Sequence, residues 1–232
     1  GLSKTGNGTL ILTGANTYSG TTNIGLGTLQ IGNGSANGSI SNTSQMVNNG
    51  SLIFNRTGNT TFNANITGSG ELTVTGGGNL TLLGDSNLNG QVYIINGTLS
   101  IGNGGTNGSI WISPIDIGTN GQLVINHSDD VSLDMAIRDY AVGDHGRIAS
   151  IGTGTTTILG AATYTGNTTI NNGSVVFLRN VGPSTSGFVG NGSLTIDPNG
   201  SSFGQSFYTG NYTFANTLTG LTIGNSTSSA NA

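Results

Sequence analysis

The feature that most limits the fold of this chain is a pair of apolar residues that recurs about every twenty positions. The two members of a pair are separated by one residue, as in Leu72-Thr73-Val74, so both side chains lie on one face of a β-strand. Gly, Asn and Ser follow each pair and are typical of turns. The first four pairs are Leu10/Leu12, Leu29/Ile31, Leu52/Phe54 and Leu72/Val74.

This spacing predicts an all-β fold, a parallel β-solenoid with turns of about 19–24 residues. Each turn would pair its strands with the turns above and below, and the inward apolar side chains would stack in ladders. A β-sandwich also has many short strands, but it has no reason to repeat its sequence strand by strand. We therefore expect residues 1–232 to form one segment of a longer solenoid rather than several domains.

A longer repeat is superimposed on the short one. Leu10 corresponds to Leu80 and Leu29 to Leu99, seventy positions later, and Gly14–Gly20 matches Gly160–Gly166. The sequence thus predicts about three superrepeats, near 1–75, 76–151 and 152–232.

Composition excludes several classes of protein. Only 6% of residues are charged, against about 25% in ordinary domains, and five Lys and Arg residues cannot form a nucleic-acid footprint. The chain has no Cys, which removes disulfides and thiolate metal sites. No apolar run approaches the roughly 18 residues of a membrane span, so we expect this segment not to span a membrane. No cofactor is expected.

The residues from Leu2 to Ile24, followed by Gly27-Thr28-Leu29, resemble the passenger-associated transport repeat of bacterial autotransporters. The resemblance recurs more weakly at 152–175 and 76–99, where the second copy has Leu88 near the place of the Tyr. It implies a right-handed parallel β-helix displayed outside a Gram-negative cell and exported by type V secretion. The outer-membrane translocator would then lie outside this segment. The residues that fit the pattern are Gly14, Asn16, Tyr18, Gly20, Thr22, Ile24, Gly27 and Leu29.

One segment differs from the rest in its charge. Residues 127–147 hold both histidines and five of the nine acidic residues of the chain. Eight positions separate Ile137 from Gly146, whereas three separate the corresponding pair in the first superrepeat, which indicates a longer loop. Loops on rigid scaffolds often carry function. We predict a partner-binding loop with its contact residues near the tip: Asp139, Tyr140, Asp144 and His145.

Two other interpretations of this segment remain open: a solvated insertion without a partner, and a metal site. The acidic spacing matches no ordered oxygen-ligand loop, so no metal ligand is predicted. For the aromatic residues Trp111, Tyr93, Tyr140 and Tyr208, packing in the core or in ladders is favoured over a sugar-stacking platform.

The sequence and the resemblance together predict an extracellular structural rod. It would act as a stalk or mediate adhesion, aggregation or biofilm contact. Its partners would be proteins or glycans of host or neighbouring cells, or other copies of itself. The alternative is a subunit of a filament that stacks head to tail, since open solenoid ends expose strand edges. The third hypothesis, a polysaccharide-active β-helix, requires paired carboxylates such as Asp129/Asp130 or Asp139/Asp144. Because no catalytic constellation is evident, we expect no enzyme.

Overall fold

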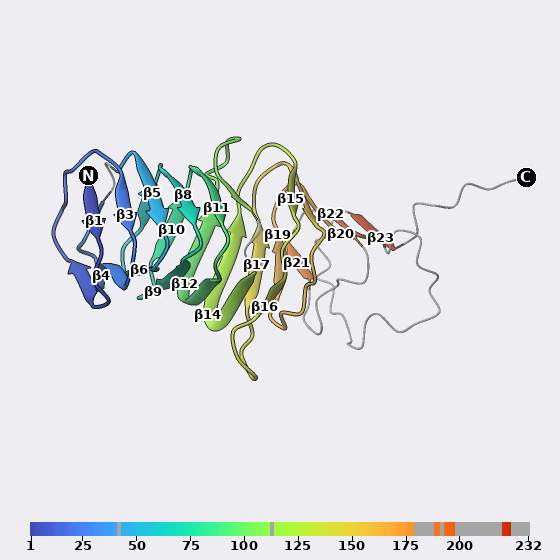
Figure 1. Cartoon of the computed structure of the whole chain (residues 1–232). Helices are drawn as coiled ribbons and strands as arrows, with labels where there is room; N and C mark the ends of the chain where they lie inside the picture. The colour runs from blue at the N-terminus through green and yellow to red at the C-terminus, as the bar shows by residue number, and fades with distance from the viewer. Residues whose placement is uncertain (41–42, 112–113, 179–187, 191–192, 198–219, 224–232) are drawn as a thin grey trace, which may run out of the picture.

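The computed structural model describes residues 1–40, 43–111, 114–178, 188–190, 193–197 and 220–223. Within these ranges the regular structure is all strand, every strand pair is parallel, and the strands wind into a β-solenoid of about 8 turns. Figure 1 shows the strands stacked along one axis from β1 onward. The fold class predicted from the sequence is therefore confirmed. Most of the third predicted superrepeat beyond 178, with Tyr208, lies outside the described residues.

The strands form three ladders, which we call the first, second and third faces of the rod. Strands β12 (Val92–Ile101) and β14 (Ile115–Ile125) are long enough to run along two faces. Their pairing has a register shift between Ile94 and Asn96, at the corner between these faces. The first face contains β2 (Thr9–Leu12), β4 (Thr28–Ser35), β6 (Ser51–Arg56), β9 (Glu71–Thr75), the first halves of β12 (Val92–Ile101) and β14 (Ile115–Ile125), and β16 (Ile137–Asp139). The second face contains β7 (Thr60–Phe62), β10 (Asn79–Leu82), the second halves of β12 and β14, β17 (Arg147–Ser150), β19 (Thr168–Ile170) and β21 (Phe188–Gly190).

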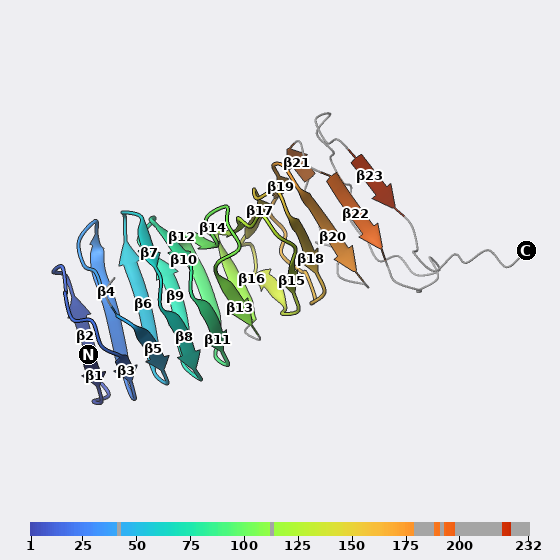
Figure 2. The ribbon, with the colours of Figure 1, turned by 90° about the horizontal axis from the view of Figure 1, so that it is seen from above.

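The third face is built from short strands and is interrupted once. Its N-terminal sheet contains β1 (Leu2–Lys4), β3 (Thr22–Ile24), β5 (Gln45–Asn48), β8 (Asn65–Gly68), β11 (Asp85–Leu88) and β13 (Ser109–Trp111). Its C-terminal sheet contains β15 (Val131–Leu133), β18 (Thr155–Ile158), β20 (Ser174–Leu178), β22 (Ser193–Asp197) and β23 (Gly220–Ile223). No ladder joins β13 to β15 among the described residues, although β15 occupies the same place in its turn (Figure 2).

The recurring apolar pairs form the core ladders that the sequence predicts. Leu10 pairs with Leu29, Leu29 with Leu52, and Leu52 with Leu72 along the first face. The inward members from Leu29 onward are buried in one continuous hydrophobic core. The interval between successive pairs in the sequence is therefore the length of a turn. Some turns are longer than the predicted range, because Leu123 pairs with Ile148 and Leu194 pairs with Leu221.

The three related sequence copies lie on three different faces. The Leu10 strand, β2, belongs to the first face, whereas the corresponding strand of the second copy, β10, belongs to the second face. The corresponding strand of the third copy, β18, belongs to the third face. The interval between successive copies therefore spans a whole number of turns plus one face. Equivalent positions of successive copies point away from the rod in different directions.

A column of glycines forms the corner between the third and first faces. Gly50, Gly70 and Gly90 occupy this corner in successive turns, and each lies directly against the turn before it. A Cβ on Gly70 would lie 2.2 Å from the carbonyl oxygen of Gly50, and one on Gly90 would lie 2.2 Å from that of Gly70. The close approach of consecutive turns at this corner thus requires glycine.

The Asn-Gly turns are not all alike. Left-handed backbone is found at Asn172 (φ 62°) and Gly173, and at Gly97, as expected for Asn and Gly in tight turns. The similar sequence Asn48-Asn49-Gly50 has no positive φ. There the side chain of Asn48 is buried and donates a hydrogen bond to the carbonyl of Glu71 in the next turn, at 2.8 Å.

Candidate functional site

The predicted loop exists and projects from the rod. It spans 140–146 between β16 and β17, at the corner of the first and second faces, and extends below the rod in Figure 1. Its turn lies at Val142 and Gly143, where Gly143 has a φ of 90° and Asp144 N–H donates to the Ala141 carbonyl at 3.1 Å. An open hollow of about 650 Å³ lies beside it, lined in part by Arg138, Tyr140 and Thr163.

Asp144 fastens the loop to the preceding turn. Its Oδ1 accepts hydrogen bonds from Thr119 Oγ1 at 2.6 Å and from Thr119 N–H at 3.1 Å. Its Oδ2 accepts a third from Ala141 N–H at 2.9 Å. The Thr119 hydroxyl is the main cause of a lowered pKa for Asp144, so this carboxylate is ionised at neutral pH.

Asp139 fastens the other end of the loop to the following turn. Its Oδ1 accepts from Gly146 N–H at 2.8 Å and from Thr165 N–H at 3.1 Å. The Thr165 hydroxyl lies 2.7 Å from Asp139 Oδ2, and His145 Nδ1 lies 2.9 Å from that hydroxyl. Asp139 and Asp144 therefore hold the loop to the two neighbouring turns. Asp139 is the last residue of β16 and lies at the base of the loop instead of near its tip, whereas Asp144 directly follows the turn at Val142 and Gly143.

The outer surface of the loop is apolar and aromatic. Val142 is fully exposed at the tip, and Tyr140 is 46% exposed. The Tyr140 ring packs edge-on against Tyr93 of β12, with centroids 5.6 Å apart and planes at 89°. His145 is exposed beside them. Val142 was absent from the predicted contact residues. The sequence feature that could have identified Val142 is the apolar pair Ala141-Val142, which stands between charged residues.

Asp116 of β14 does not face a second carboxylate in the next turn of the first face. The register instead places Arg138 opposite Asp116, with Nε 2.7 Å from Oδ1 and Nη2 3.1 Å from Oδ2. This bidentate pair neutralises Asp116 on the surface of the first face.

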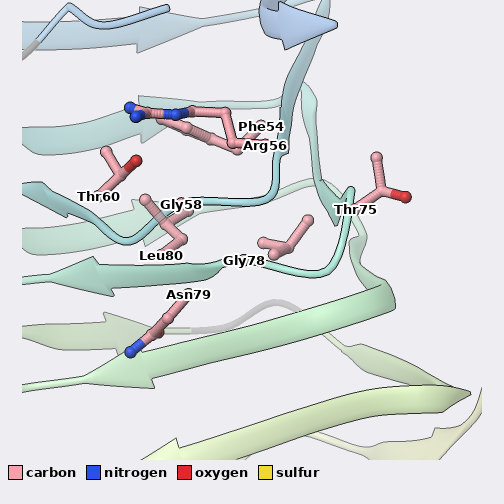
Figure 3. A pocket seen from close by; sticks show the side chains of 9 residues that line it. Phe54, Arg56, Gly58, Thr60, Thr75, Gly78, Asn79 and Leu80 are labelled. Carbon is pink, nitrogen blue, oxygen red and sulfur yellow. The ribbon is translucent and has the colours of Figure 1, made fainter. Parts of the chain in front are cut away.

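The cavity in Figure 3 is not a ligand site. It lies among Phe54, Arg56, Gly78 and Leu80 and holds about 10 Å³, which is about the space of one water molecule. Arg56 donates from Nη2 to the Ala36 carbonyl of the preceding turn. The cavity is thus a packing defect at a corner of the solenoid.

Other kinds of site have no candidates within the described part of the chain. No group of three or more His, Asp or Glu side chains there is placed to hold a metal ion. None of the described segments is a helix of the length and apolar character needed to cross a bilayer.

Two segments of the solenoid match a family of known repeats. Residues 2–31 and 151–177 match the family model of the passenger-associated transport repeat. Two segments of the chain are thus similar to passenger-associated transport repeats. The two matched repeats cover strands of different faces, β2 with β4 and β18 with β20. The weaker copy expected at 76–99 lies outside both matches.

One curated relative is the adhesin BmaC autotransporter of Brucella suis biovar 1 (strain 1330), which is 45% identical over 69 residues. That stretch is 30% of this chain but 2% of the relative, so the chain matches a small part of a much longer protein. No solved structure matches the chain significantly. Together with the repeats, this relative supports an autotransporter passenger made of transport repeats on a β-solenoid.

The fastening of the loop by Asp144 gives a first prediction. The folded-state pKa of Asp144 lies below its ordinary value of 3.8, so its stabilising effect is present above that value and is lost as pH falls through the folded pKa. We expect Asp144→Asn at neutral pH to reduce hydrogen-exchange protection of the Thr119 and Ala141 amides, with little change in global stability. The matched control is Asp134→Asn, an exposed carboxylate outside the loop. Unchanged protection in Asp144→Asn would contradict the fastening role.

Proposed function

We propose that this chain is a structural and adhesive rod within the surface-displayed passenger of an autotransporter-like protein. The observation that carries the proposal is the coincidence of two transport repeats with a continuous parallel solenoid core. A solenoid is stabilised by contacts between neighbouring turns, so it can fold progressively as it emerges outside the cell. This property suits an exported stalk.

Contact with a partner is assigned to the loop 140–146. The rod surface carries few charges, while the loop offers the exposed Tyr140 and Val142 together on a short projection. Asp139 and Asp144 fasten both ends of the projection, which limits the entropy lost on binding. Aromatic anchors on a rigid support are typical of interface hot spots. The partner would be a protein or glycan on a host or neighbouring cell, or another copy of the chain.

The contact role predicts a loss of adhesion when the loop tip becomes polar. Beads coated with the chain would be tested for capture by cultured epithelial cells and by beads carrying the same chain. We expect Tyr140→Ser combined with Val142→Ser to weaken capture by about tenfold, since truncating an interface anchor costs more than about 1 kcal/mol.

The matched control for this experiment is Leu26→Ser, which changes an exposed apolar residue at a different place on the rod. It should leave capture unchanged. If the loop variant and the control are captured as well as the original chain, the contact role of the loop is wrong. Loss of capture in the bead–bead arm alone would identify self-association as the activity of the loop.

A further inference from the structure

A small groove lies where the third face is interrupted. Its volume is about 160 Å³, and its walls come from β13 and its neighbours on one side and from the segment leading into β15 on the other. The edge of β13 that faces β15 has no ladder partner among the described residues. The groove is below the roughly 300–1,000 Å³ of a drug-sized pocket, so it suits a single side chain or a group of that size.

Trp111 stands at the end of β13 and is 55% exposed. Its indole N–H donates to Ser109 Oγ at 2.8 Å, and Ser109 Oγ in turn donates to Asp85 Oδ1 at 2.9 Å. The one polar hydrogen of the indole is therefore used within the chain. What the ring offers to a ligand is its π surface. Trp111 does not pack in the core, since alternation after the buried Ile110 turns it outward, but it lies in the ladder of the third face opposite Asn87 of β11.

The acidic groups that line the groove are carboxylates, which only accept hydrogen bonds when ionised. Asp85, Asp129 and Asp130 are all exposed carboxylates that line it. Asp129 Oδ1 lies 3.0 Å from His127 Nδ1, and this hydrogen bond is the main cause of the lowered pKa of Asp129. Asp130 Oδ1 accepts from Thr155 N–H at 2.8 Å. The lining residues include no Lys or Arg.

His127 closes one wall of the groove. The ring is 5% exposed, and its Nε2 is buried with no hydrogen-bond partner in the described structure. A carboxylate such as Asp129 can only accept, so Nδ1 of His127 donates the hydrogen of the bond between them. The Nε2 edge of the ring packs against Gly102, where an added Cβ would lie 2.7 Å from it.

We propose that this groove binds the guanidinium group of an arginine side chain presented by a peptide or protein partner. A guanidinium has five donors and no acceptor, which complements the three carboxylates of the lining. Its planar cation stacks on the face of Trp and pairs with carboxylates. An acidic ligand would be repelled by the three carboxylates. The site lies on the face opposite the corner that carries the loop 140–146 and does not rest on the proposed role of that loop.

Trp111 is the single Trp of the chain, so its fluorescence reports directly on the groove. The chain would be titrated with the blocked peptide Gly-Arg-Gly and with the same peptide carrying citrulline, the neutral isostere of Arg. We expect a saturable fluorescence change with the Arg peptide that weakens as salt is raised. The citrulline peptide should bind about tenfold more weakly, because it loses the cation–π and ionic attraction. Methyl glucoside and glucuronate should give no saturable change.

Variants localise the effect to the groove. Asp85→Asn and Asp130→Asn should each weaken binding of the Arg peptide several-fold, whereas Asp134→Asn, which removes the same charge outside the groove lining, should not. The loop variant with Tyr140→Ser and Val142→Ser should also leave the titration unchanged. Equal binding of the Arg and citrulline peptides, saturation by the sugar instead, or no saturable response to the Arg peptide would each overturn the proposal. The peptide comparison uses the unaltered chain and therefore holds even if a variant fails to fold.

Discussion

Replacing Leu72 with Ala is expected to lower the free energy of unfolding by about 2–5 kcal/mol. Leu72 is fully buried on β9, stacked between Leu52 of the preceding turn and Val92 of the following one. The substitution removes contacts with both neighbours and leaves a cavity that parallel, hydrogen-bonded turns cannot easily close. Urea unfolding followed by circular dichroism would measure the loss.

The loss of stability in Leu72→Ala should also be concentrated in the turns next to the substituted residue. In a solenoid, stability is approximately a sum of the turns and the interfaces between neighbouring turns. Hydrogen-exchange protection should therefore fall most in β6, β9 and β12. The control is Ile11→Ala on the outward side of β2, where the side chain is half-exposed and the expected change is within about 0.5 kcal/mol. Similar losses in the two variants would mean that the stacked apolar pairs are not the main source of stability.

The sequence was sufficient to predict the ladders of the first face. Alternation marks which side chains point inward, and the repeat spacing identifies which of them stack, as for Leu10 with Leu29. Both signals are local or periodic, and neither depends on how the corners between faces are shaped. The close match of Leu10, Leu29, Leu52 and Leu72 to one ladder follows from this.

The interruption of the third face could not be predicted in the same way. It depends on how many residues each corner uses, and the turn from Leu99 to Leu123 and the turn from Leu123 to Ile148 are both longer than most. The faces of the related copies could not be predicted either, because β2, β10 and β18 have similar sequences and lie on different faces. Similarity reports the local conformation of a repeat but not the number of faces that separate two copies.

Charge and length were sufficient to predict the candidate loop. They were not sufficient to predict what its residues do. The sequence predicts Asp139 and Asp144 as contact residues because the charged segment is longer than its counterpart and loops on rigid scaffolds often carry function. Their donors, Thr165 and Thr119, belong to the following and the preceding turn and are distant in the sequence. Only the register between turns brings them together, and a shift of one residue would reverse which side chains face each other.

The glycine column gives the second large prediction, Gly70→Ala, with an expected loss of about 1–3 kcal/mol. The added Cβ would lie 2.2 Å from the Gly50 carbonyl oxygen, far inside van der Waals contact. That oxygen accepts the hydrogen bond of Glu71 N–H at 3.0 Å, so the clash falls on a bond that joins two turns. Relief requires the turns to separate, which weakens the pairing of β6 with β9 beside it.

The control for this substitution is Gly14→Ala, because a Cβ at Gly14 would meet no atom within 4 Å. There the change should be neutral or stabilise by up to about 1 kcal/mol through a less flexible unfolded chain. Urea midpoints of the two variants, with exchange protection at Glu71, would compare the effects. The two glycines are alike in the sequence, and the distance between consecutive turns is what separates them. If Gly70→Ala proved as stable as Gly14→Ala, the corner would be able to widen at little cost, and close stacking of the turns would not be what keeps glycine there.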